Sequence, residues 1–304
     1  MKRRLVIPVH PPKISWLLLF LTSLRDRGEA SASSVEIWLI CSHHEDVIFF
    51  SNAVEFLLPD IAIRILNVES YIEAALGGGA LISHVRNNVN DAVINVKKFI
   101  ALHHLHKMNF NFLIVIDADS FCIGSLNTLF GEAERNYATK RIYGAGERAP
   151  ERAIPIYPLI LAGSASLLSQ LHQNRLQLSQ AATIFTWFLS PPSYQGDDLC
   201  AFFEYMEREH GDIQNFMMKL TYYTFDHVVF TQFLAATRDF ELFDYTAHAI
   251  LDMPESLGIA ALQTLQHRFG FHPVWIRART YLAHPLASAR LFPNVAMLCH
   301  MDRN

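Results

Sequence analysis

The sequence predicts an α/β fold in which a mostly parallel sheet is flanked by helices. Short apolar runs alternate with stretches of helical spacing along the first half of the chain, which is the pattern of strands joined by helices. The chain has 304 residues, 51% of them hydrophobic and 18% charged, so it can bury a sizeable core. The most informative run, residues 112–116, leads directly into the carboxylates of Asp117 and Asp119.

The elements of the first half follow from these apolar runs in order. We predict a strand over residues 5–10, a helix over 15–24, a strand over 35–41, a helix over 45–58 and a strand over 61–66. Pro59 ends the second of these helices. Three glycines at 77–79 have no strand immediately before them, so they are interpreted as a loop and not as a phosphate-cradling turn.

Residues 90–108 are predicted to form the helix that leads into the acid-bearing strand. Apolar side chains in this stretch have core-facing spacing, so at least one of Lys97 and Lys98 has to point away from the sheet. A lysine one helix ahead of the acids is a candidate ligand for a diphosphate. The alternative is a solvated lysine pair, and the sequence favours neither.

The run at 112–116 is rich in β-branched residues, as expected for a strand buried on both faces. Ligands of open α/β sheets bind outside the carboxyl ends of the strands. Carboxylates placed there suit a hard divalent cation, so Asp117 and Asp119 are predicted to hold Mg²⁺ or Mn²⁺ on a phosphorylated substrate. The alternative is a pair of acids that caps the next turn.

Charge and cysteine usage exclude several classes of protein. The net charge of −4 gives no basic excess with which to recruit nucleic acid. The four cysteines are far apart and mostly embedded in apolar sequence, which favours reduced core thiols and therefore a cytoplasmic location.

The amino terminus resembles the charged start of a signal peptide, but prolines at 8, 11 and 12 interrupt its apolar stretch. The later apolar run at 16–21 is too short to span a bilayer, so we expect no transmembrane segment. The basic residues at 2–4 remain a candidate for contact with an anionic membrane surface.

Residues 96–102, together with residues 116–126, resemble the donor-binding core of the GT-A glycosyltransferases. The similarity is greatest to the glycogenin-like and bacterial galactosyltransferase-like branch, in which a helical lysine precedes a strand ending in D-A-D. The resemblance implies a metal-dependent transferase that moves a sugar from a nucleotide-sugar donor, a UDP- or GDP-sugar, to a hydroxyl of a glycan or glycoconjugate acceptor. It implies one GT-A domain, with a donor half over 1–125 and an acceptor half over 126–304.

The same resemblance assigns roles to individual residues. Asp117 and Asp119 would hold Mn²⁺ or Mg²⁺ on the donor diphosphate. Asp119 would contact the metal directly, and Asp117 would lie closer to the ribose or bind the metal through water. Val9 and His10, at the end of the first strand, would lie near the base and ribose. Such a cation neutralises the charge that grows on the nucleoside diphosphate as the sugar leaves.

A third metal ligand is expected near the carboxyl end of such enzymes, often a histidine at the end of a strand. Residues 294–300 have that form, so His300 is the first choice and His284 the second. The chain contains 15 histidines, and the alternative is that neither of these two binds a metal.

Two acids compete for the catalytic role. Asp226 begins a predicted helix ahead of a strand at 240–243, and resembles the acid of an acid-plus-polar pair beneath the donor sugar of glycogenin-like enzymes. Asp198 resembles the base at a helix start in inverting enzymes such as fringe. Either acid alternatively caps its helix. Inversion requires a carboxylate base and retention does not, and both mechanisms stay open.

The acceptor side is expected from the second half of the chain. Residues 157–169 resemble the small-residue strand and turn that approaches the donor sugar in several GT-A families, with a tight turn entering a helix as the alternative. Tyr194, Trp187 and Trp275 are candidates to line a sugar acceptor site, although aromatic residues are more often part of a core.

Two other functions compete with the transferase. The acids at 117 and 119 also resemble the first motif of haloacid-dehalogenase-like phosphatases, in which Asp117 would be the nucleophile and residues 196–198 the late metal-binding motif. Three predicted strands precede that motif here, whereas it usually opens the phosphatase fold. The remaining alternative is a non-catalytic sugar-binding protein.

Overall fold

A computed structural model describes residues 2–26, 35–118, 120–122, 125–144, 157–174, 192–244, 275–277 and 298–300. Its centre is a five-stranded sheet in the order β3-β2-β1-β4-β7. The first four strands are parallel, and β7 pairs antiparallel with β4. The bounds are β1 (Arg3–Pro8), β2 (Val35–Cys41), β3 (Ile63–Asn67), β4 (Phe112–Val115) and β7 (Ser193–Gln195). The predicted α/β fold with a mixed, mostly parallel sheet is therefore confirmed.

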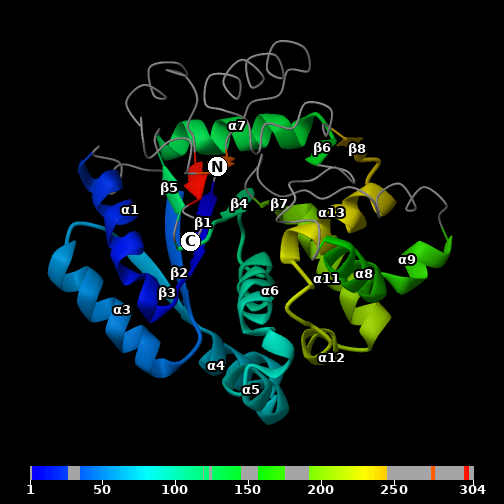
Figure 1. Ribbon diagram of the computed structural model, residues 1–304, viewed down its shortest axis with the longest axis horizontal. Helices are drawn as coiled ribbons and strands as arrows, with labels where there is room; N and C mark the ends of the chain where they lie inside the picture. The colour runs from blue at the N-terminus through cyan, green and yellow to red at the C-terminus, as the bar shows by residue number, and fades with distance from the viewer. Residues whose placement is uncertain are drawn as a thin grey trace.

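Helices cover both faces of this sheet, as Figure 1 shows. One face packs against α1 (Ile14–Asp26), α3 (His44–Leu57) and α7 (Leu126–Ala138). The other packs against α4 (Val68–Tyr71), α5 (Gly79–Arg86), α6 (Val93–His106), α11 (Gly196–His210), α12 (Ile213–Met218) and α13 (Asp226–Thr237). Elements from both halves of the sequence thus pack around one sheet, so the described residues form a single domain.

The apolar strands supply side chains to both layers because successive residues of a strand point to opposite faces. Leu5 and Ile7 of β1 lie in the core beneath α1 and α3, whereas Val6 lies in the core beneath α6. All four residues of β4 are buried. Burial on both faces explains why these strands are continuous apolar runs and do not alternate with polar residues.

The remaining elements surround this sheet. They are η1 (Pro11–Lys13), η2 (Ile72–Leu76), η3 (Val89–Asp91), α8 (Tyr157–Leu167), α9 (Ser169–Asn174), the sheet formed by β5 (Ser120–Cys122), β10 (Leu298–His300) and β9 (Trp275–Arg277), and the pair β6 (Arg141–Gly144) and β8 (Glu241–Asp244). Gly77 follows η2 with φ +64 and Gly79 begins α5, so the glycine run joins two helices, in agreement with the loop predicted there.

The prediction of a strand and turn over residues 157–169 was wrong, because this segment is helix α8 followed by the start of α9. Pro158 lies in the first turn of α8, where the absence of its N–H costs no hydrogen bond. Gly163 lets the helix approach its neighbour: a Cβ there would lie 3.3 Å from the backbone oxygen of Tyr223. The small residues therefore serve close packing of α8 against the segment that enters α13.

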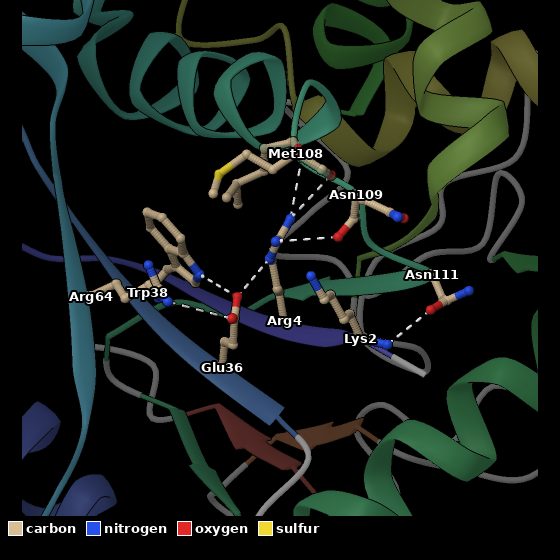
Figure 2. A network of polar contacts seen from close by, with 9 residues as sticks. Lys2, Arg4, Glu36, Trp38, Arg64, Met108, Asn109 and Asn111 are labelled. Carbon is tan, nitrogen blue, oxygen red and sulfur yellow. Dashed lines mark hydrogen bonds and ion pairs between the residues drawn. The ribbon is translucent and has the colours of Figure 1, made fainter.

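Two of the basic residues at the amino terminus, Arg3 and Arg4, form ion pairs within the fold. Arg3 pairs with Glu134 at 2.6 Å. The Arg4 side chain is only 3% exposed and pairs with Glu36 at 2.9 Å. Figure 2 shows how its guanidinium also faces the carbonyl oxygens at the end of α6, at 3.3 Å for Met108 and 3.4 Å for Asn109. Within the described ranges, no helix combines the length and apolar character that a bilayer span requires.

Candidate functional site

A cleft of about 290 Å³ opens at the carboxyl ends of β1 and β4. Pro8 and His10 line it from the end of β1, and Val115 and Asp117 line it from the end of β4. In the strand order, β2 and β3 lie on one side of β1, whereas β4 lies on its other side. The chain therefore leaves β1 in one direction along the sheet and returns to β4 in the other. This is the switch point at which open α/β sheets bind ligands.

Asp117 and Lys98 form an ion pair at the wall of this cleft. Asp117 follows β4, and its Oδ1 lies 2.9 Å from Nζ of Lys98 on α6. Nζ of Lys98 also lies 3.9 Å from Oδ1 of Asp226, the first residue of α13. The Asp117 side chain is 30% exposed and that of Lys98 12%, so this ion pair stands at the wall of the cleft.

Asp226 lies behind this pair, with no exposed surface. The hydroxyl of Tyr194, on β7, donates a hydrogen bond to its Oδ2. Burial raises the pKa of Asp226, but the charge of Lys98 and the contacts with His227 and Tyr194 outweigh it, so the pKa lies below its ordinary value. Asp226 is thus a buried, ionised carboxylate in contact with Lys98.

His227 is a residue that the sequence argument missed. It lines the cleft and is 8% exposed, and among the described residues neither of its ring nitrogens has a hydrogen-bond partner. Its Nδ1 lies 3.8 Å from Oδ1 of Asp226, which is beyond hydrogen-bonding distance. Its place directly after Asp226 at a helix start was the available signal. A buried imidazole with two free nitrogens can bind hydroxyl groups of a ligand.

Lys97 and Val9 are structural, contrary to the prediction that they line the donor site. The Lys97 side chain is buried, and its Nζ donates a 2.7 Å hydrogen bond to the backbone oxygen of Val9. Burial lowers the pKa of Lys97 to about 8. Neither residue belongs to the described lining of the cleft, whereas His10 and Lys98 do. Of the predicted lysine pair, only Lys98 reaches the site.

Asp198 belongs to a different cluster from Asp226. The hydroxyl of Tyr137 donates a 2.7 Å hydrogen bond to its Oδ2, and Nε of Arg238 lies 3.0 Å from its Oδ1. The described contacts join Asp198 to neither Lys98 nor Asp117. The structure therefore brings Asp226, and not Asp198, together with the acid at the end of β4.

Of the predicted acceptor aromatics, only Tyr194 has a described side chain. Tyr194 is fully buried, and its hydroxyl contacts Asp226. Trp187 lies outside the described residues, and Trp275 is described only as the first residue of β9.

The proposed metal ligands are only partly described. Asp119 and His284 lie outside the described residues. The backbone of β10 pairs antiparallel with β5, with His300 opposite Ser120, the residue that follows Asp119. The register thus brings the backbone at His300 beside the D-A-D segment. In the part of the chain whose side chains are placed, no three histidine, cysteine, aspartate or glutamate side chains gather as a metal would need.

Comparison with known proteins adds no further assignment. No protein-family model matches the chain. No curated protein matches it either. The functional argument therefore rests on the geometry of the cleft and on the chemistry of its residues.

Proposed function

We propose that the protein is a metal-dependent glycosyltransferase of GT-A fold, which transfers a sugar from a UDP- or GDP-sugar to a hydroxyl of a glycan or glycoconjugate. The observation that carries the proposal is the position of Asp117 and Lys98. They form an ion pair at the wall of a cleft, at the carboxyl end of a buried central strand. A cation and a carboxylate at a switch point suit a diphosphate and its counterion.

The donor set suits a hard metal. Carboxylates of Asp117 and Asp119 with an imidazole from His300 would hold Mn²⁺ or Mg²⁺, and the register of β10 against β5 supports this combination. The bound cation would supply positive charge beside the leaving diphosphate. Lys98 would add a second, fixed positive charge on the same group.

Other residues at the cleft would bind the nucleoside and the sugar of the donor. His10, exposed at the end of β1, would bind the nucleoside. His227 would contact sugar hydroxyls through its ring nitrogens, which have no hydrogen-bond partner in the described part of the chain. Because Asp226 is fully buried, it would act on the donor through Lys98 and not as a base on the acceptor.

A thermal-shift experiment tests the proposal. UDP or GDP is expected to raise the melting temperature only when Mn²⁺ or Mg²⁺ is present, because a ligand that binds the native state stabilises it. The Asp119→Asn variant should lose this metal-dependent shift. Asp198→Asn is a matched control, since it removes the charge of an acid that contacts Tyr137 and Arg238.

Other outcomes would favour the competing functions. Turnover of a generic phosphomonoester that disappears in Asp117→Asn would support the haloacid-dehalogenase-like phosphatase. Stabilisation by a glycan, with no response to any nucleotide, would support the sugar-binding protein. Either result would replace the transferase proposal.

A further inference from the structure

A second cavity, of about 80 Å³, borders the cleft. Side chains of α7, β6, β7 and α13 line it. Pro192 and His227 line both the cavity and the cleft, so the two spaces adjoin at these residues. A ligand that binds in the cleft beside His227 is therefore next to the cavity.

The size of the cavity suits a side group of a ligand and not a whole sugar. One water molecule needs about 10–15 Å³ of such volume, so the cavity can hold a group of several non-hydrogen atoms. The cleft, at about 290 Å³, is the larger space, and its wall carries the ion pair of Asp117 and Lys98. A sugar in the cleft can thus place one substituent in the cavity.

Much of the cavity wall is apolar. Phe230 and Leu234 line it from α13, Ile142 from β6, and Phe240 from the residue before β8. Phe230, Leu234 and Phe240 are buried in the core, so this part of the wall is fixed by packing. Such a wall favours a hydrocarbon group and disfavours a hydroxyl, which would lose its hydrogen bonds with water.

The charged lining of the cavity is already neutralised. Arg141 is the one lysine, arginine, aspartate or glutamate among the described lining residues. Its Nε lies 3.2 Å from Oε2 of Glu241. A carboxylate or phosphate substituent would have to compete with Glu241 for this cation, whereas a neutral substituent would not. The lining therefore favours a neutral group.

His227 supplies hydrogen bonding at the border between cleft and cavity. It is 8% exposed, and its two ring nitrogens have no hydrogen-bond partner in the described part of the chain. An uncharged imidazole has one N–H donor and one acceptor nitrogen. An amide has a donor N–H and an acceptor C=O, so it can bond either ring nitrogen. An amide that carries a methyl group matches both His227 and the apolar wall beyond it.

We propose that the donor sugar is an N-acetylhexosamine, whose acetamido group binds at His227 and places its methyl group in this second cavity. The inference rests on the proposed function, because it takes the cleft as the site of the donor. It adds the class of sugar that is transferred.

The test compares UDP-N-acetylglucosamine with UDP-glucose, which differ only in the acetamido group. Their dissociation constants are measured by calorimetry with Mn²⁺ present. Thr231→Met fills the cavity, which Thr231 lines from α13. Thr237→Met is the matched control, since it makes the same exchange on the same helix at a residue outside the described linings of both spaces.

We expect the wild-type protein to bind UDP-N-acetylglucosamine about ten-fold or more tightly than UDP-glucose, since a small group in an apolar pocket discriminates by that much. Thr231→Met should bring the ratio of the two affinities close to one, and Thr237→Met should leave it as in the wild type. Thr231→Ala enlarges the cavity, so it should bind UDP-N-propionylglucosamine better, relative to UDP-N-acetylglucosamine, than the wild type does. This second variant tests the cavity even if methionine disturbs α13.

Equal wild-type affinities for the two donors, or the same ratio in Thr231→Met as in Thr237→Met, would overturn the inference. If UDP still bound in a metal-dependent way in that case, the proposed function would stand without it. A protein that binds neither UDP nor any UDP-sugar or GDP-sugar with Mn²⁺ would refute the proposed function, and the assignment of the donor sugar with it.

Discussion

Lys97 gives a prediction whose size can be worked out from the structure. The amine is buried, with Val9 as its one described hydrogen-bond acceptor, and burial lowers its pKa from 10.5 to about 8. At 1.36 kcal/mol per pH unit, this fall means that charged Lys97 destabilises the native state by about 3 kcal/mol near neutral pH. Lys97→Met removes that cost but leaves the Val9 oxygen unpaired, which costs about 1–3 kcal/mol. The two proteins should therefore have similar stability near neutral pH.

The pH dependence of stability distinguishes the wild-type protein from Lys97→Met. Because the pKa of Lys97 is lower in the folded state, the unfolded chain binds more protons between about pH 8 and about pH 10.5. Wild-type stability should rise relative to Lys97→Met across this window, by about 3 kcal/mol in total. Urea unfolding of both proteins at a series of pH values measures the difference. If the unfolding free energies of the two proteins changed in parallel with pH, the buried, hydrogen-bonded placement of Lys97 would be refuted.

Two further predictions concern the layer around α6. Burial lowers the pKa of His103 to about 3. The stability of the wild-type protein should therefore fall relative to that of His103→Phe as the pH drops below about 6.5, by at most about 5 kcal/mol. Urea unfolding of both proteins at a series of acidic pH values would measure this difference. A wild-type curve parallel to that of the variant would contradict this. Arg4→Met should destabilise the protein by about 1–3 kcal/mol in urea unfolding, because it leaves the carbonyl oxygens of Met108 and Asn109, just after α6, without their buried donor. Arg25→Met, at an exposed pair, should cost less than about 1 kcal/mol, and equal costs for the two variants would contradict the argument.

The strands and helices of the first half were predictable because each carries its own periodic signal. The strand predicted at 35–41 matches β2 residue for residue, and the helix predicted at 45–58 differs from α3 by one residue at each end. Burial of β4 on both faces likewise follows from an uninterrupted apolar run. Segment 157–169 failed because small and apolar residues suit a closely packed helix as well as a strand.

The site was less predictable because its contacts join residues far apart in the sequence. The acid at 117 is marked by the strand before it, but nothing local distinguishes Lys97 from Lys98. Their difference arises from helix rotation, which turns one amine towards Val9 and the other towards Asp117. The bond from Tyr194 to Asp226 depends on an antiparallel edge strand that the sequence did not reveal.

Hydrolysis of a panel of nucleotide sugars tests the central claim most directly, since a transferase without its acceptor can pass the sugar to water. With Mn²⁺ present, we expect slow release of UDP or GDP from at least one donor, and loss of that release in both Asp119→Asn and Lys98→Met. Asp198→Asn should retain it. No metal-dependent release from any donor, together with no metal-dependent binding of UDP or GDP, would contradict the account.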